Sequence, residues 1–103
     1  YSMAFMQQSI LSDSSKIELV EIFTRSSPPC SYCDHAKKLL RNKLPNIQIT
    51  EYDFIENSQK FTELRAKYPS VKSVPQILIT MKNGSRWHIG GYNELLQGFL
   101  ATA

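Results

Sequence analysis

The two cysteines of this chain stand at the junction of a predicted strand and a predicted helix, and this junction restricts the fold more than any other stretch. Residues 16–24 (KIELVEIFT) mix β-branched and aromatic residues, as in a buried strand. Pro28 and Pro29 end that strand, because two successive prolines cannot continue a ladder of hydrogen bonds. Residues 31–43 then follow a helical pattern with one apolar face, so Cys30 stands where this helix begins.

The rest of the chain continues the alternation of strands and helices. We expect strands at residues 47–54, 75–80 and 85–89 and helices at residues 57–68 and 93–101. The order β-α-β-α-β-β-α predicts an α/β fold with a four-stranded mixed sheet and helices on both faces. Because strands joined by a crossover helix run parallel, we expect the hairpin at Lys82-Asn83-Gly84 to add the antiparallel edge strand.

A length of 103 residues suits one domain with its own hydrophobic core. Residues 1–16 predict a flexible N-terminal extension whose first three residues could be a cloning remnant, and residues 17–103 predict the folded domain. The extension lacks the basic start and apolar core of an export signal, so we expect a cytoplasmic location. In that reducing compartment a close cysteine pair is more often catalytic or metal-binding than structural.

The charge and the apolar runs exclude several classes of partner. The net charge of +3 would suit a small anionic substrate, and it is equally compatible with an ordinary solvated surface. No run of Lys and Arg interleaved with aromatic residues indicates nucleic-acid binding. No apolar run approaches the roughly 20 residues that a membrane-spanning helix needs, so we expect no membrane partner.

Several uses of the pair Cys30 and Cys33 have to be weighed. A structural disulfide between residues three apart closes a very small loop and restrains little of the unfolded chain. A zinc site needs four ligands, and beyond the cysteines only His35 and His88 offer ring nitrogens. Two inert core cysteines are a further alternative. A redox-active dithiol is the interpretation that we favour.

The predicted helix gives the two thiols different roles. Its N-terminus offers Cys30 unpaired N–H groups and a partial positive charge, both of which favour a thiolate. Arg25, Lys37 and Lys38 add positive charge nearby. Cys33 lies one helical turn further on and is expected to be more buried. Cys30 is therefore predicted to be the attacking thiol and Cys33 the resolving one.

Three motifs in this order resemble those of glutaredoxins. They are VEIFTRSSPPCSYCDHAKKLL at residues 20–40, VPQILI at residues 74–79 and GGYNEL at residues 90–95. The resemblance covers about residues 17 to 100, and the cysteine motif with its long preceding loop is also similar to the small glutaredoxins of bacteriophages. It implies a thioredoxin-like fold.

The resemblance also implies an activity. Glutaredoxins are thiol–disulfide oxidoreductases that reduce protein disulfides and glutathione mixed disulfides, with glutathione as reductant and a separate reductase using NADPH. The implied partners are glutathione and disulfide-containing or glutathionylated proteins, ribonucleotide reductase among them, and the implied state is a monomer. Reduction by a thioredoxin reductase instead of glutathione remains an alternative.

By position in the family motifs, Cys30 is the nucleophile and Cys33 the resolving cysteine. The implied glutathione-binding residues are Arg25, Tyr32, Lys72, Ser73, Val74, Pro75, Gly90, Gly91 and Asn93. The resemblance implies a cis peptide bond between Val74 and Pro75, and pairing of the Val74 backbone with the cysteine part of glutathione. The two glycines would let the backbone approach its γ-glutamyl end.

The basic residues and the last helix would bind the charged ends of glutathione. Lys72 and Arg25 are expected to hold its two carboxylates, and Asn93 stands near the N-terminus of a helix, where a carboxylate ligand is favoured.

The chain departs from the usual family pattern in three places. Ser31 replaces the proline of C-P-Y-C, Arg25 stands five residues before Cys30 where a lysine usually stands three before, and Asn93 replaces an acidic or hydroxyl residue. Some relatives with C-S-Y-C bind a [2Fe–2S] cluster between two subunits, through this first cysteine and two glutathiones. An iron–sulfur carrier, with Cys30 as the metal ligand in a dimer, is therefore the alternative function, and otherwise we expect no metal.

Overall fold

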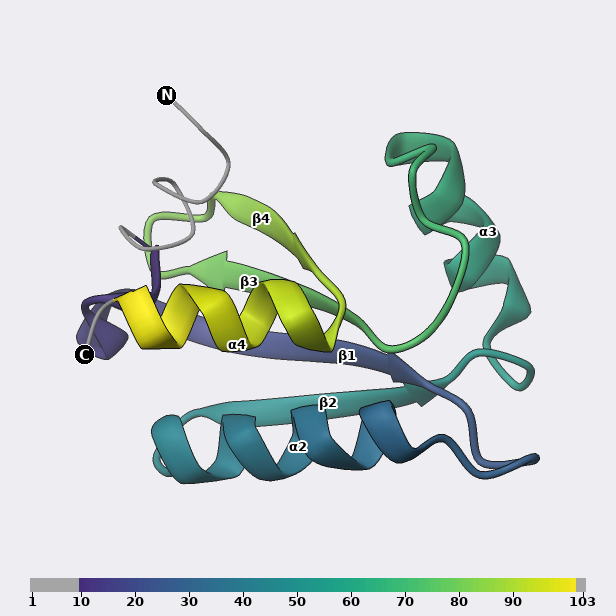
Figure 1. Cartoon of the computed structure of the whole chain (residues 1–103). Coiled ribbons are helices and arrows are strands. Elements are labelled where there is room, and N and C mark those ends of the chain that lie inside the picture. Colours follow the sequence, from purple (N-terminus) through teal and green to yellow (C-terminus); the bar gives the residue numbers. More distant parts are fainter. Residues whose placement is uncertain (1–9, 102–103) are drawn as a thin grey trace.

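The four predicted strands form one sheet in the order β2-β1-β3-β4. The computed structural model describes residues 10–101 (Figure 1). The strands are β1 (Ile17–Thr24), β2 (Gln48–Asp53), β3 (Gln76–Met81) and β4 (Arg86–Gly90), and the helices are the 3-10 helix η1 (Ser14–Lys16), α2 (Ser31–Lys43), α3 (Ser58–Lys67) and α4 (Tyr92–Ala101). Each predicted element agrees with these bounds to within one residue at either end. Within residues 10–101 no helix has the length and apolar character to cross a bilayer.

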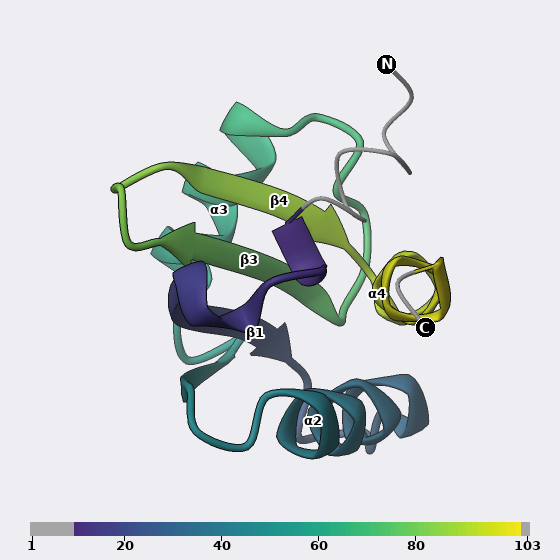
Figure 2. The same cartoon turned by 90° about the vertical axis from the view of Figure 1, so that its left-hand side faces the viewer.

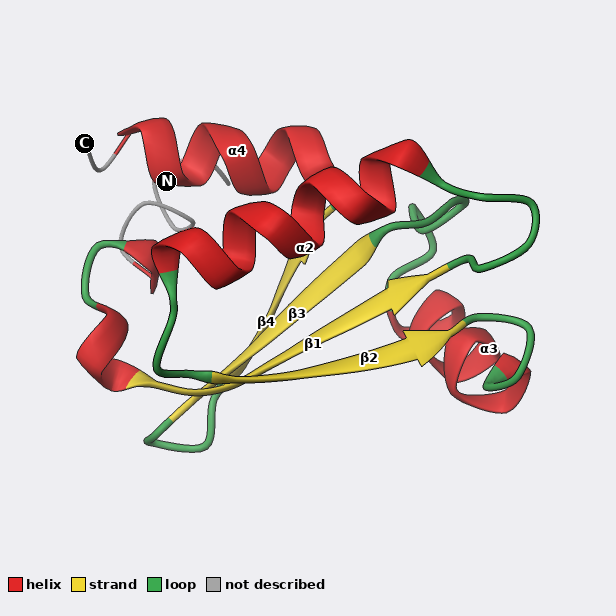
Figure 3. Ribbon diagram, turned by 90° about the horizontal axis from the view of Figure 1, so that it is seen from below, coloured by secondary structure: helices red, strands yellow, loops and turns green. Residues whose placement is uncertain are grey.

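The direction of β3 corrects the sequence prediction. β1 and β2 run parallel, as a crossover helix requires, but β3 runs antiparallel to β1 and to β4. The reason is the course of the chain between β2 and β3. The short helix α3 lies at the end of the sheet toward which β1 and β2 point, and it does not lead the chain back to where those strands begin (Figures 1 and 3). β3 therefore starts beside the end of β1, with Gln76 paired to Phe23.

Helices cover both faces of the sheet, as predicted (Figures 2 and 3). α2 and α4 lie on one face, where the main core brings together buried side chains of the sheet, of α2 and of α4, among them Val20, Ile22, Ala36, Leu40, Leu95 and Phe99. α3 covers the other face over a smaller core of Phe23, Leu64, Val71 and Leu78. The alternation along β1 explains this division, because successive side chains of a strand point to opposite faces.

The segment before β1 contributes two side chains to the main core. We expected residues 1–16 to form a flexible extension, and residues 1–9 lie outside the described residues. Ile10 and Leu11 are only 6% and 5% exposed and belong to the main core. Asp13 caps η1, where its side chain accepts a hydrogen bond from the Ser15 N–H. Ile10 and Leu11 are therefore packed on the domain, whereas residues 12–16 are exposed.

Candidate functional site

Three segments that are far apart in the sequence meet at one end of the sheet. β1 ends at Thr24, β3 begins at Gln76 opposite Phe23, and β4 ends at Gly90 opposite Ile77. An added Cβ on Gly91 would lie 3.3 Å from the carbonyl oxygen of Pro75, so the glycine pair lies directly against the segment before β3. The reversed direction of β3 is what brings all three motifs to the end where Cys30 stands.

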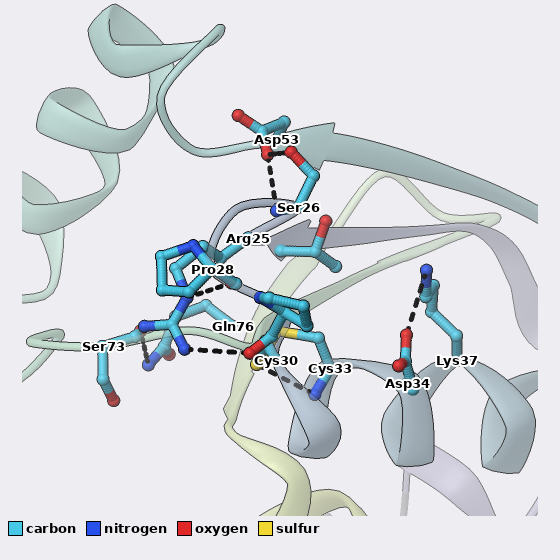
Figure 4. The surroundings of a disulfide bond; sticks show 12 residues. Arg25, Ser26, Pro28, Cys30, Cys33, Asp34, Lys37, Asp53, Ser73 and Gln76 are labelled. Atoms are coloured by element: carbon cyan, nitrogen blue, oxygen red, sulfur yellow. Dashed lines mark hydrogen bonds and ion pairs between the residues drawn. A yellow bond between two sulfur atoms is a disulfide. The ribbon is translucent and has the colours of Figure 1, made fainter.

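The two cysteines form a disulfide at the start of α2 (Figure 4). Cys30 is the N-cap of the helix, with extended backbone angles, and its sulfur accepts a hydrogen bond from the Cys33 N–H at 3.2 Å. Cys33 is 1% exposed and Cys30 is 8% exposed. Cys30 is therefore the more exposed residue of the pair, and its sulfur is the one at the helix N-terminus.

Lys37, one of the lysines of α2, contributes less positive charge near Cys30 than the sequence suggested. The Lys37 ammonium lies 3.1 Å from Glu51 and 3.6 Å from Asp34. Burial works against ionisation of Glu51, but hydrogen bonds from the Thr24 hydroxyl and from Lys37 outweigh it and lower the pKa of that carboxyl. Because Lys37 is paired with acids, its charge is partly neutralised, and the helix N-terminus remains as a support for a Cys30 thiolate.

The loop between β1 and the dithiol is fixed by side chains at both ends. The Arg25 guanidinium donates to the carbonyl oxygens of Pro28 at 2.9 Å and Pro29 at 3.4 Å (Figure 4). Asp53 accepts hydrogen bonds from the Ser26 N–H at 2.9 Å and the Ser26 hydroxyl at 2.7 Å. These bonds lower the pKa of Asp53. The structure thus gives Arg25 a role in holding the loop that the sequence did not predict.

The segment before β3 contains the predicted cis peptide bond between Val74 and Pro75. A second cis bond, Ser27–Pro28, was not predicted. Lys72 and Ser73 are exposed, and Pro75 is buried. The side chain of Gln76 is nearly buried and donates to the Ser73 carbonyl at 2.8 Å.

The glycine pair leads directly into α4. Gly90 has a φ of 113°, which favours glycine, and the Gly91 N–H donates to the carboxylate of Glu94 at 2.8 Å. Glu94 thus caps the N-terminus of α4 by reaching back one turn. Asn93 is exposed in the first turn of the helix.

Aromatic rings border the dithiol on the helical side. Tyr32 is 59% exposed, and its ring centroid lies 6.0 Å from that of Tyr92 and 6.2 Å from that of His35. The His35 and Tyr92 rings lie 5.7 Å apart. α2 and α4 thus present three neighbouring rings next to the cysteines.

The family model for glutaredoxins matches residues 20–83 of this chain, which include the cysteine motif, the cis-proline segment, most of β1 and all of β2 and β3. The chain belongs to the glutaredoxin family.

Individual glutaredoxins show the same relationship. The chain is 37% identical over 60 residues to mitochondrial glutaredoxin-2 of Rattus norvegicus, covering 58% of this chain and 37% of the relative. It is 36% identical over 75 residues to mitochondrial glutaredoxin-2 of Pongo abelii, covering 73% of this chain and 42% of the relative. It therefore spans about two fifths of the length of these relatives.

A solved structure shows which fold this chain shares. The solution structure of a glutaredoxin from Brucella melitensis matches with a TM-score of 0.51 and 26% identity, over 79% of this chain and 77% of that one. The fold of this glutaredoxin is therefore thioredoxin-like, as the sequence predicted. Cys30 and Cys33, which form the disulfide, lie within the part of the chain that the glutaredoxin family model matches.

Two residues near the site of this glutaredoxin were not singled out from the sequence. Gln76 links the loop before β3 to His88 on β4, through its side-chain oxygen 2.7 Å from the His88 Nε2. The sequence analysis considered His88 as a possible zinc ligand. A glutamine just after a strand-starting proline was the one available signal, because polar side chains are seldom placed at the start of a buried strand without a partner.

No group of three or more His, Cys, Asp and Glu side chains within residues 10–101 could hold a metal ion. Zinc bound within one chain therefore has no support among these residues. A [2Fe–2S] cluster shared between two glutaredoxin chains would need only Cys30 from each, so that alternative stays a prediction.

Proposed function

We propose that this glutaredoxin is a glutathione-dependent thiol–disulfide oxidoreductase that reduces protein disulfides and glutathione mixed disulfides. One observation carries the proposal: Cys30, the more exposed of the two cysteines, caps α2 at the end of the sheet where the cis peptide bond before Pro75 and the Gly90–Gly91 turn also lie. A tripeptide bound along these two backbone segments would have its sulfur at Cys30.

The proposed reaction begins with attack of the Cys30 thiolate on one sulfur of a substrate disulfide. A new S–S bond joins Cys30 to that sulfur, the substrate S–S bond breaks, and the displaced sulfur leaves as a thiolate that takes a proton from water. The buried Cys33 next attacks the Cys30 sulfur and releases the second substrate sulfur as a thiolate. The product is the Cys30–Cys33 disulfide, which is the state that the structure holds.

Two molecules of glutathione would complete the cycle. The first attacks the Cys30–Cys33 disulfide and forms a mixed disulfide on Cys30, which frees Cys33. The second attacks the glutathione sulfur, so that oxidised glutathione leaves and Cys30 returns as a thiolate. With a glutathionylated substrate, Cys30 takes up the glutathione directly, and one further glutathione releases it without Cys33.

The binding groups for glutathione remain those of the family motifs. Lys72 is exposed beside the cis-proline segment and is the proposed partner of one carboxylate. Arg25 is the proposed partner of the other, although its guanidinium also holds the loop carbonyls of Pro28 and Pro29. Tyr32, Ser73 and Asn93 are exposed around the same end of the sheet and complete the proposed pocket.

The test compares Cys30→Ser with Cys33→Ser in an assay coupled to NADPH through glutathione reductase. We expect Cys30→Ser to abolish reduction of both a protein disulfide and a glutathionylated peptide. Cys33→Ser should keep the reaction with the glutathionylated peptide and lose that with the protein disulfide, because only the first uses Cys30 alone. Activity of the unaltered protein with thioredoxin reductase and none with glutathione would refute the proposal.

A further inference from the structure

Two linked hydrogen bonds connect His88 on β4, through the side chain of Gln76, to Ser73 in the loop before β3. The His88 Nε2 lies 2.7 Å from the Gln76 side-chain oxygen, and the Gln76 amide nitrogen lies 2.8 Å from the Ser73 carbonyl oxygen. The His88 ring also stacks on Tyr68, which follows α3, with centroids 4.6 Å apart. These contacts thus connect β4 and the end of α3 to Ser73.

The chemistry of the three groups determines which atom donates and which accepts in each of these two hydrogen bonds. The Ser73 carbonyl can only accept a hydrogen bond, so the Gln76 amide nitrogen must face it and the amide oxygen must face His88. The His88 Nε2 must then carry the hydrogen. Burial lowers the pKa of His88, with Glu94 acting in the opposite direction, so the ring is neutral at pH 7 with its proton on Nε2.

The two linked hydrogen bonds determine how the Ser73–Val74 peptide bond is oriented. This bond is not one of the two cis bonds, and in a planar trans peptide the C=O and the N–H point in opposite directions. With the Ser73 carbonyl turned toward Gln76, the Val74 N–H points away from Gln76. Among the described residues no acceptor takes this N–H, so it is available to a ligand.

We infer that His88 and Gln76 are positioning residues that hold the Val74 N–H ready to pair with the peptide backbone of a disulfide substrate. This inference rests on the proposed function, since glutathione is the peptide whose sulfur Cys30 would attack. Neither side chain touches the reacting sulfurs. Their loss should therefore weaken the reaction with disulfides that carry a peptide backbone and spare disulfides that carry none.

The experiment uses reduced protein mixed with oxidised glutathione or with bis(2-hydroxyethyl) disulfide, which has no peptide group. His88→Phe keeps a ring to stack on Tyr68 but removes the donor, and Gln76→Met keeps the approximate shape of the side chain but removes the amide. We expect each to react about three- to tenfold more slowly with oxidised glutathione, the range for one lost hydrogen bond. The rate with bis(2-hydroxyethyl) disulfide and the rate of Cys30 alkylation should change less than about twofold.

The conservative variant His88→Gln places an amide N–H where the ring donor stood, and it should recover the glutathione rate to within about twofold. Equal losses with both disulfides, or no loss with either, would overturn the inference. If unaltered protein shows no preference for oxidised glutathione, the proposed function fails first and the inference with it. A preference that the variants leave unchanged refutes the inference alone.

A measurement on the unaltered protein keeps the test independent of how well the variants fold. Nitrogen-15 NMR of the imidazole distinguishes the two neutral tautomers. A proton on Nε2 of His88 is the expected result. A proton on Nδ1 would exclude donation to Gln76 and overturn the inference.

Discussion

Cys30 differs from Cys33 because it stands outside the helix that Cys33 has already entered. As the N-cap, its sulfur accepts the Cys33 N–H and lies at the positive end of α2. A thiolate in that place is stabilised, whereas a thiolate at the 1%-exposed Cys33 would lose solvation. The asymmetry of the mechanism therefore follows from three positions along one helical turn.

The first prediction concerns the reactivity of the reduced protein. In Cys33→Ser, which leaves Cys30 as the one thiol, the rate of alkylation by iodoacetamide should rise with pH with a midpoint below the free-cysteine value of about 8.5, because the helix N-terminus favours the thiolate. In the matched variant Cys30→Ser, the remaining Cys33 should react more slowly and titrate at higher pH. Identical midpoints for the two thiols would contradict the assignment of roles.

At the residue scale, the sequence allowed prediction of those features that depend on a few neighbouring residues or on a family motif. The positions of Cys30 and Cys33, and the cis bond before Pro75, follow from motifs of a few residues. The link between Gln76 and His88 could not be predicted in the same way, since the two are 12 residues apart and meet only when β3 and β4 pair. The bonds from Arg25 to its own loop were missed because a basic residue near the dithiol was interpreted as a charge beside Cys30 and as a ligand for glutathione.

At the scale of elements, the junction of β4 and α4 leaves little room for a side chain at Gly90. Gly90 has a positive φ, and a Cβ there would lie 2.8 Å from the Glu94 carboxylate oxygen and 3.2 Å from the Glu94 Cβ. The hairpin glycine Gly84 also has a positive φ, of 90°, but an added Cβ would meet nothing within 4 Å. The two glycines thus separate the cost of backbone strain from the cost of crowding.

The second prediction compares these two glycines. Gly84→Ala should lower the free energy of unfolding by about 1–3 kcal/mol, the usual cost of an unfavourable backbone conformation. Gly90→Ala should lose a further 1–3 kcal/mol or so, because the new methyl group crowds Glu94 and disturbs its bond to Gly91. Urea denaturation of both variants measures the difference. Equal losses would show that Glu94 moves aside at little cost.

The order of the elements was predictable, but the direction of β3 was not. Periodicity located each strand and helix to within one residue, because apolar side chains repeat with the spacing of the element that buries them. The direction of a strand depends on whether the helix before it leads the chain back along the sheet. Nothing in the sequence of α3 indicates that this helix fails to do so. The general rule for crossover helices gave the wrong direction for β3. The family resemblance, in contrast, implied that the three motifs form one site, and they do lie at one end of the sheet.

At the scale of the whole molecule, the sheet is covered by a large core on one face and a small one on the other. The large core includes Ile10 and Leu11, so the fold extends to residues before the first strand. Sequence reasoning missed this, because two apolar residues within a serine-rich stretch show no period. Their burial depends on contacts with the other members of the core, which come together only in the folded chain.

The third prediction tests whether residues 10–16 stabilise the domain. Ile10→Ala should lower the free energy of unfolding by about 2–5 kcal/mol, the range for truncating a buried aliphatic side chain. Leu100→Ala is the control, because Leu100 is 64% exposed and should change stability by no more than about 0.5 kcal/mol. Thermal or urea unfolding of the reduced protein measures both. An Ile10→Ala protein as stable as the control would show that the segment contributes nothing to the fold.

The hairpin between β3 and β4 offers a place to attach this protein to a surface. Met81 pairs with Ile17 at the start of β1, so the turn that follows it stands at the far end of the sheet from Cys30. The eight residues of β1 separate the two ends by roughly 25 Å. A linker joined to Lys82, which is exposed, would leave the dithiol facing the solution. An electrode or bead coated in this way would present every molecule with its reactive end outward, which is the orientation that a redox sensor needs.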